Sequence, residues 1–295
     1  MGIGPSDRDV NPLLHAGDRL PALLALMGGS VPTLDQPRTS GPGGTAYPLA
    51  ATLGIEGTPQ SGTGQVALLT GESAAEIFGR HFGPWTPVRL RPLLEERSML
   101  RRAANAGRTV AFANAYPKGW PGPKGGRRVA GPPLAARAAG ALDRHEEHLS
   151  RGRAVASEIV NDGWRRNQGH LGHNALPDVT AWEAGMNLAR ISRDADLTLF
   201  AHYATDTAGH AQDMDRALEA LALVDEFFAG VVAELSSDTL LLVASDHGNL
   251  EDVRGGHTRN PALGLAAGPG AEGAAALADL REVAPFILTR LGVAT

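Results

Sequence analysis

The sequence contains no cysteine, which excludes disulfide bonds, thiolate metal sites and cysteine nucleophiles. It also lacks an excess of basic residues. The 27 Lys and Arg residues stand against 32 Asp and Glu residues, and the formal net charge is -5. Proteins that bind nucleic acids or anionic membranes in a general way present a basic surface. We therefore expect neither kind of partner.

Long apolar runs are absent too. No stretch is long enough to span a bilayer, and the first residues do not show the charged and then apolar pattern of a secretory signal. These absences predict a cytoplasmic protein. With 295 residues, 43% of them hydrophobic, the chain is long enough to bury a large core. We expect one large domain, or one that carries a smaller insert.

The most informative stretch is residues 239–251, an apolar run that ends in Asp246 and His247. An apolar run closed by turn residues is typical of a strand buried on both faces of a parallel sheet. In open α/β sheets, ligands bind beyond the carboxyl ends of the strands, where this pair lies. A carboxylate beside an imidazole suits a cation such as zinc or manganese. The alternative is a strand end with a solvated Asp-His pair.

The surrounding pattern predicts an α/β fold. Residues 195–203 resemble a second buried strand, and residues 214–235 carry apolar side chains at the three- and four-residue steps of an amphipathic helix. Strand, helix and strand in this order predict a βαβ unit with a right-handed crossover. We therefore expect a mostly parallel sheet with helices on both faces. Residues 262–267 form a short apolar segment, and a last helix is expected at residues 277–291.

Residues 72–182 are rich in Arg, Gly and Pro, and we interpret them as an inserted, smaller α+β cap domain. The core would then comprise residues 1–71 and 183–295. Within the cap we expect a strand at residues 109–114 and helices near residues 93–106 and 134–148. Basic clusters are more often solvated than functional, but those of the cap can also meet an anionic substrate. The candidates for this contact are Arg80, His81, Arg89, Arg91, Asn114 and Lys118.

Candidate metal ligands follow the predicted strands or lie in later loops. Asp206 and His210 are four residues apart, so both side chains point to one side if that turn is helical. Asp246 and His247 follow the next strand, and His257 lies downstream. Each has a simple alternative explanation, such as an exposed helix start or a turn. Their common placement at strand ends predicts a metal site.

Residues 57–65 form a turn of small residues ahead of a segment that can begin a helix. A hydroxyl at a helix N-terminus is well placed for phosphoryl chemistry, because the backbone N–H groups and the helix dipole favour anionic oxygens. The alternative is a Ser or Thr that caps a tight turn.

Together these motifs resemble those of the alkaline phosphatase superfamily, and in particular its branch of cofactor-independent phosphoglycerate mutases and phosphopentomutases. The segments that carry the resemblance are Asp206-Thr-Ala-Gly-His210, Ser245-Asp-His-Gly-Asn249, His257-Thr-Arg-Asn-Pro261, Pro32-Thr-Leu-Asp35 and residues 57–65. The resemblance implies two divalent ions, manganese or zinc. Asp206, His210 and His257 would hold one ion, and Asp246, His247 and the nucleophile hydroxyl would hold the other. The family pattern assigns the nucleophile to Ser61, with Thr63 as the alternative.

The sequence departs from the family pattern in two places. Gln65 stands where the family has the His of a Gly-His pair. The family also carries a metal-ligand Asp at the end of its first strand, and Met1 takes the place just after that Asp-Gly. We expect this strand and its carboxylate to be missing because of a start codon assigned too far downstream or a truncation, with a weaker sheet as the result. Asp7 or Asp9 could in principle substitute, but the proline-rich loop in which both lie disfavours this.

The motifs thus predict a metal-dependent phosphatase or phosphomutase that acts on a small phosphorylated metabolite through a phosphoserine at Ser61. A bound cation would lower the pKa of the serine hydroxyl and neutralise phosphate oxygens. The alternatives are a phosphodiesterase and a metal- or ligand-binding relative without turnover. A sulfatase is disfavoured, because Cys is absent and no Cys/Ser-x-Pro-x-Arg segment surrounds Ser61.

Overall fold

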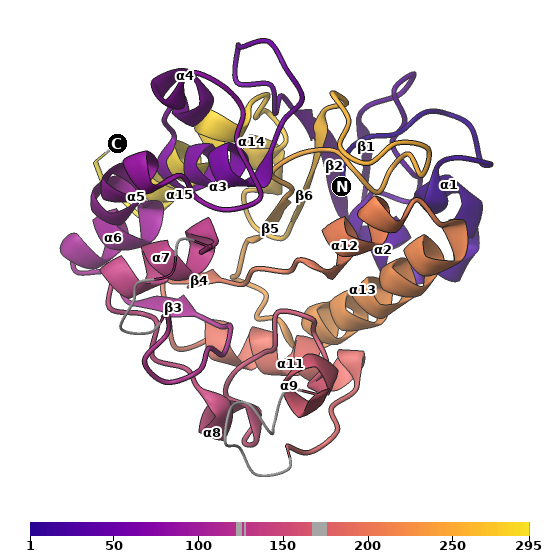
Figure 1. Ribbon diagram of the computed structural model, residues 1–295. Helices are drawn as coiled ribbons and strands as arrows, with labels where there is room; N and C mark the ends of the chain where they lie inside the picture. Colours follow the sequence, from indigo (N-terminus) through magenta and orange to yellow (C-terminus); the bar gives the residue numbers. More distant parts are fainter. Residues whose placement is uncertain (122–125, 127, 167–175, 295) are drawn as a thin grey trace.

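The computed structural model describes residues 1–121, 126, 128–166 and 176–294. Its centre is a four-stranded sheet in the order β1-β2-β6-β5 (Figure 1). These strands are β1 (Thr39–Gly41), β2 (Gly44–Leu49), β6 (Ala262–Ala267) and β5 (Leu241–Ala244). A separate two-stranded sheet pairs β3 (Val110–Phe112) with β4 (Leu197–Leu199). The fold is therefore α/β, as predicted.

The expected direction of the strands is wrong for the main sheet. All three of its pairings are antiparallel, and among the described strands only β3 and β4 run parallel. The prediction treated β4 and β5 as neighbours in one sheet. Instead β5 pairs with β6, the segment that the sequence marked only as short and apolar. Strand direction depends on which partner is found in space, and hydrophobic pattern does not specify that partner.

Strand β5 is half-buried along its length and not buried on both faces as expected. It pairs with β6 at one edge, and its other edge meets no strand in the part of the chain that the structure describes. Its side chains alternate between two hydrophobic clusters. Leu242 and Ala244 contact one cluster, whereas Leu241 and Val243 contact the other.

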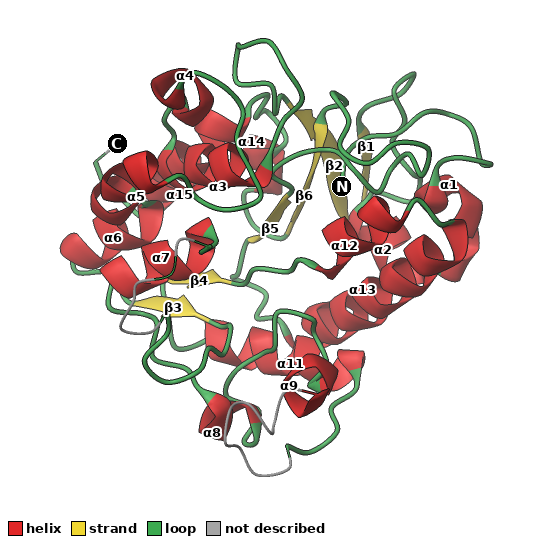
Figure 2. Cartoon of the chain, viewed as in Figure 1, coloured by secondary structure: helices red, strands yellow, loops and turns green. Residues whose placement is uncertain are grey.

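Helices cover both faces of the main sheet, as expected (Figure 2). On one face, α3 (Ser61–Thr70) and α15 (Val283–Arg290) share a cluster with Tyr47, Leu49 and Ala266. On the other face, α2 (Pro21–Leu26) and α13 (Met214–Glu234) share a cluster with Ala46, Leu263 and Leu265. The side chains of β6 supply both clusters in alternation, so this strand lies at the centre of the molecule.

Helix α13 confirms the predicted amphipathic helix, and it begins where the side chain of Asp213 accepts a hydrogen bond from the backbone of Arg216. It packs against α11 (Ala181–Ser192), which begins with a capping box formed by Thr180 and Glu183. No described helix, α13 included, is both long and apolar enough to cross a membrane.

The other described helices are short. They are α1 (Pro12–Ala16), α4 (Ala74–Phe78), α5 (Arg91–Arg97), α6 (Met99–Asn105), α7 (Gly131–Ala138), α8 (Glu146–Leu149), α9 (Asp162–Arg166), α12 (Ala204–Ala211) and α14 (Ala271–Ala274), with 3-10 turns at Gly17–Arg19, Val88–Leu90 and Leu280–Glu282. The helix expected near residues 134–148 is divided into α7 and α8. The strand expected at residues 109–114 is confirmed as β3.

The division into core and cap stays a prediction, and part of the expected cap lies outside the described residues. Helices α5, α6 and α7 come from the expected cap, yet Leu94, Leu100 and Leu134 belong to the same hydrophobic cluster as α3 and α15. In addition, β3 of the expected cap pairs with β4 of the expected core. The two parts therefore share buried surface.

Candidate metal centre

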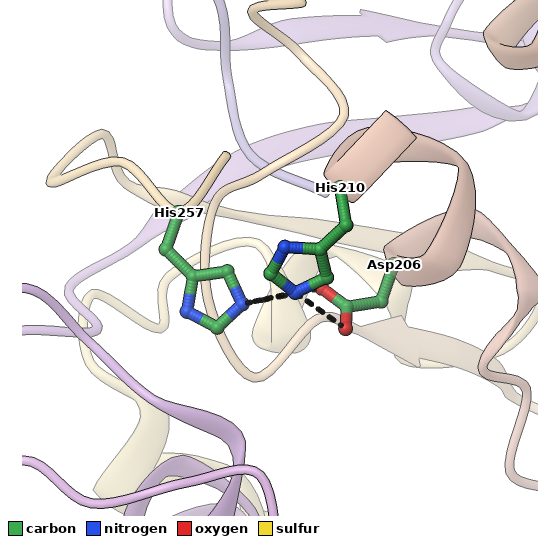
Figure 3. Close-up of side chains that lie close together, drawn as sticks. All are labelled: Asp206, His210 and His257. Atoms are coloured by element: carbon green, nitrogen blue, oxygen red, sulfur yellow. Dashed lines mark hydrogen bonds and ion pairs between the residues drawn. The ribbon is translucent and has the colours of Figure 1, made fainter. Parts of the chain in front are cut away.

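Asp206 and His210 lie one turn apart on α12, and His257 lies in the loop between β5 and β6. The metal-binding atoms of the three side chains all lie within 4.8 Å of one another. Figure 3 shows the two imidazole rings beside the carboxylate. The Nε2 atoms of His210 and His257 are 3.1 Å apart, and these atoms lie 3.4 and 3.5 Å from oxygens of Asp206. The structure thus brings the first predicted ligand set together.

The tautomer of His257 suits a metal ligand. Its Nδ1 lies 3.0 Å from the carbonyl oxygen of Pro59, which can only accept, so Nδ1 carries the proton of the neutral ring. The Nε2 atom then presents a lone pair toward Asp206 and His210. Metal-binding histidines are commonly oriented by such a hydrogen bond from the second ring nitrogen. Two imidazole nitrogens and one carboxylate form a donor set that fits a divalent cation.

Asp206 and His257 perturb one another. Burial opposes the charge of Asp206, but the hydrogen bonds from Asn249 and from the protonated form of His257, together with the charges that His247 and His257 carry when protonated, outweigh burial and lower the pKa of this carboxyl group. Burial lowers the pKa of His257, but the hydrogen bond to Asp206 and the negative charge of Asp206 outweigh burial and raise the pKa of this imidazole. The centre therefore holds a negative carboxylate that attracts cations.

Ser61 begins α3, and only 7% of its surface is exposed. Its Oγ lies 2.8 Å from Nε2 of His247. The Nδ1 of His247 faces the carbonyl oxygen of Gly248 at 3.1 Å, so in the neutral ring Nδ1 donates and Nε2 accepts from the Ser61 hydroxyl. An oxygen of Asp246 lies 3.6 Å from the same Nε2. The second predicted ligand set is thus also close together.

The two sets are neighbours. The Nε2 of His247 lies 3.9 Å from Oδ1 of Asp206, and the ring centroids of His247 and His257 are 4.0 Å apart. Residues that are far apart in the sequence, on α3, on α12 and in the loop after β5, therefore meet at one place. The helix N-terminus at Ser61 adds backbone N–H groups that favour an anionic oxygen.

The alternative residues are less well placed. Thr63 is fully buried, and its hydroxyl donates to the carbonyl oxygen of Gln60 and accepts from the backbone N–H of Phe82, both at 3.2 Å. The cluster of described residues that could hold a metal does not include Asp7 or Asp9, which are exposed.

Two further side chains contact the candidate ligands, and the sequence analysis gave neither a role. Asn249 donates from Nδ2 to Oδ1 of Asp206 at 2.6 Å. Gln65 donates to Asp246 at 3.1 Å and accepts from the backbone N–H of Gly131 at 3.0 Å. Asn249 lies two residues after His247 and Gln65 one turn after Ser61. Proximity in the sequence to a ligand is the signal that could have identified them.

The candidate substrate contacts divide into groups. Arg80 and His81 line a hollow of about 460 Å³ next to Gln60, the residue before Ser61. Asn114 is buried and exchanges two hydrogen bonds with the backbone of Ala201, so it joins β3 to the chain after β4. The other three lie elsewhere: Arg89 is exposed, Arg91 donates to the carbonyl oxygen of Gly126, and Lys118 pairs with Glu147.

Comparison with known proteins agrees with this chemistry. Residues 178–295 match the family model described as Metalloenzyme superfamily. A 2,3-bisphosphoglycerate-independent phosphoglycerate mutase of Desulforudis audaxviator is 36% identical over 131 residues, which are 41% of this chain and 26% of that protein. The corresponding mutase of Halobacterium salinarum is 31% identical over 110 residues, 34% of this chain and 22% of that protein. The matched part of the chain thus spans about a quarter of the length of these relatives.

A solved structure shows the fold over nearly the whole chain. A variant of the alkaline phosphatase of the Antarctic bacterium TAB5, determined with Mg bound, covers 99% of this chain and 97% of its own, with a TM-score of 0.53 and 13% identity. At this identity the match concerns the fold. The predicted resemblance to the alkaline phosphatase and phosphoglycerate mutase enzymes is confirmed, and residues 178–295 match the model of the metalloenzyme superfamily.

Proposed function

We propose that the protein is a divalent-metal-dependent phosphoryl-transfer enzyme that acts on a small phosphorylated metabolite with Ser61 as its nucleophile. The observation that carries this proposal is the meeting of two ligand sets at one place. Asp206, His210 and His257 would hold one ion. Asp246, His247 and Ser61, which adjoin them, would hold another. Manganese and zinc both suit such nitrogen and oxygen donors.

The chain supplies position and charge for the reaction. Ser61 is buried, and its hydroxyl is oriented by the hydrogen bond to Nε2 of His247. Its Oγ would form the bond to phosphorus while the ester oxygen of the substrate departs. Phosphoryl transfer depends mainly on such positioning and on stabilisation of negative charge. When bound, the cations would lower the pKa of the hydroxyl and neutralise phosphate oxygens.

The hollow beside Ser61 offers a place for the rest of the substrate. Its lining residues come from two segments, Glu56, Gly57, Thr58 and Gln60 from the first and Arg80, His81, Phe82 and Gly83 from the second. The Arg80 guanidinium lies 6.0 Å from the ring centroid of Phe82 and is exposed, so its charge remains accessible to an anionic group. We infer that this arginine faces the metabolite that carries the phosphoryl group.

Two measurements on one preparation test this function. Bound metal is determined after dialysis against manganese or zinc, and hydrolysis of p-nitrophenyl phosphate is followed with the same ions. The proposal predicts bound metal and turnover that chelation abolishes. Metal without turnover on this and other phosphomonoesters would favour a binding protein. A preference for bis(p-nitrophenyl) phosphate would favour the phosphodiesterase. Absence of both metal and turnover would contradict the proposal.

A further inference from the structure

Glu251 is a fully buried carboxylate that lies four residues after His247. Its Oε2 accepts hydrogen bonds from the backbone N–H groups of Gly2 at 2.6 Å and Asn249 at 2.7 Å. Its Oε1 accepts from the hydroxyl of Thr258 and from the side-chain amide of Asn260 at 3.2 Å. One side chain thus joins the N-terminal segment, the loop that follows β5 and the segment after His257.

Within the described part of the chain, Glu251 forms no ion pair with Lys, Arg or His, although it is completely buried. A buried charge of this kind costs free energy unless hydrogen bonds replace its water. Here four hydrogen-bond donors replace the water, two on each oxygen, which is about the number that a carboxylate accepts. The site therefore supplies hydrogen-bond donors to both oxygens of one buried side chain.

The surrounding backbone is shaped to admit this carboxylate. A Cβ atom added at Gly248 would lie 2.4 Å from Oε1 of Glu251, and one added at Gly2 would lie 2.8 Å from its Cδ. Neither position has space for a side chain. The glycine of the Asp-His-Gly motif thus allows Glu251 to approach the backbone directly beside His247.

The partners of Glu251 lead directly to the candidate metal ligands. Asn249, whose backbone N–H donates a hydrogen bond to Glu251, donates a second hydrogen bond from its side-chain amide to Asp206 at 2.6 Å. Thr258, whose hydroxyl donates a hydrogen bond to Glu251, follows His257. Its backbone N–H donates to the carbonyl oxygen of Gly248 at 3.1 Å. The two parts of the β5–β6 loop that carry His247 and His257 are therefore joined by this backbone bond and by the carboxylate of Glu251, and Asn249 links them to Asp206.

We propose that Glu251 is a positioning residue that sets the positions of Asp206, His247 and His257 relative to one another and thereby the affinity of the two ligand sets for metal. The inference rests on the proposed function, since it assumes that those sets bind cations. Glu251 itself bonds to none of the candidate ligand atoms in the structure. Its effect passes through Asn249 and Thr258. Loss of such an outer contact commonly weakens metal binding by about 10- to 100-fold.

The test is titration of metal-free full-length protein with Co²⁺, followed by visible absorption, which reports both affinity and coordination geometry. We expect Glu251→Ala to weaken binding by about 10-fold or more and to change the spectrum. Thr258→Val, which removes one of the four donors, should shift the affinity in the same direction by less. Glu251→Gln should lie nearer the wild type, because its carbonyl oxygen can keep the Gly2 and Asn249 bonds while the Thr258 hydroxyl reverses its role.

The matched control is Asp225→Ala. Asp225 is also a buried carboxylate that accepts a backbone N–H, that of Leu23 at 2.8 Å, but it lies on α13 away from the ligands. This variant should lose stability and keep the wild-type cobalt affinity and spectrum. If all the Glu251 and Thr258 variants keep them as well, the inference is wrong.

A metal-free readout separates this inference from the proposed function. Crystal structures of metal-free wild type and Glu251→Gln or Glu251→Ala give the positions of Asp206 and His257 directly. In Glu251→Ala we expect Asp206 and His257 to lie further apart, or the loop of His257 to lack electron density. If Glu251→Ala does not fold, Thr258→Val takes its place with the same expectation. Failure of the wild type to bind Co²⁺ would overturn the proposed function alone. An unmoved His257 in the variants would overturn the role of Glu251.

Discussion

The hydroxyl of Ser61 is the group on which the proposed chemistry depends. It donates to His247 in a buried position, whereas the hydroxyl of Thr63, two residues further on, forms hydrogen bonds with the backbone of Gln60 and Phe82. The two hydroxyls therefore provide a matched pair for mutation. One faces the imidazoles and the other stabilises the loops beside them.

We predict that Ser61→Ala abolishes the phosphoenzyme and lowers kcat/KM by at least about 10³-fold, because the substitution removes the oxygen that would attack phosphorus. Thr63→Val should retain the phosphoenzyme. The measurement is intact-protein mass spectrometry after incubation with a phosphomonoester and rapid acid quench. Persistence of the phosphoryl adduct in Ser61→Ala, or its loss only in Thr63→Val, would assign the nucleophile to Thr63.

His202 provides a prediction on pH that does not involve the metal centre. Burial lowers its pKa to about 4, against an ordinary value of 6.5, and its Nδ1 donates to the carbonyl oxygen of Ser157 at 2.9 Å. The folded protein therefore resists protonation of His202, whereas the unfolded chain takes up the proton below pH 6.5. The stability from the neutral ring is present above pH 6.5 and is lost as the pH falls toward 4, by up to about 3 kcal/mol.

Replacement of His202 by Asn keeps a donor for Ser157 and removes the titrating ring. We expect the free energy of unfolding of His202→Asn to fall less between pH 6.5 and 4.5 than that of the wild type, as measured by urea denaturation in chelator. His15→Asn, at an exposed site, is the control and should follow the wild type. Identical slopes for wild type and His202→Asn would show that His202 is not responsible.

At the scale of elements, the closest packing joins α11 to α13. A Cβ atom added at Gly185 would lie 2.0 Å from the carbonyl oxygen of Phe227, and one added at Gly230 would lie 2.1 Å from that of Trp182. The backbones of the two helices therefore touch at both glycines. Since α13 leads from α12 toward β5, this contact fixes the segment that connects the two ligand-bearing regions.

We predict that Gly230→Ala lowers the free energy of unfolding by about 1–3 kcal/mol, because the added methyl group forces the helices apart. This loss should occur although Ala favours a helix more than Gly does. Val232→Ala, two residues away and 52% exposed, should change stability by less than about 0.5 kcal/mol. Equal stability of Gly230→Ala and wild type in urea denaturation would mean that the helices adjust without cost.

The elements also show what sequence pattern can predict. Helix α13 was predictable because its apolar side chains recur at helical steps over 21 residues. Strand β6 was not recognised as the central strand, because Ala262, Gly264 and Ala266 resemble no strand-forming pattern although they are buried between β2 and β5. The glycine at position 264 is explained by Tyr47, whose ring lies against it. Such a fit depends on a partner that is distant in the sequence.

At the scale of the whole molecule, the candidate ligands were predictable and their supports were not. Asp206, His210, Asp246, His247 and His257 carry their chemistry in their own side chains, so short motifs reveal them. Glu251 acts through backbone N–H groups that converge only once Gly2 has folded against Asn249. No local pattern encodes that convergence. The same holds for Gln65, which joins Asp246 to α7 across a long stretch of chain.

The central claim is that cations bind where α3, α12 and the loop after β5 meet. A crystal structure of the protein soaked in manganese or zinc, with anomalous scattering to locate the ions, tests it most directly. The account predicts one ion at about 2.0–2.3 Å from Asp206, His210 and His257, and a second bonded to Asp246, His247 and Ser61. Ions found only elsewhere, or ligand atoms that stay free of metal at saturating concentration, would contradict it.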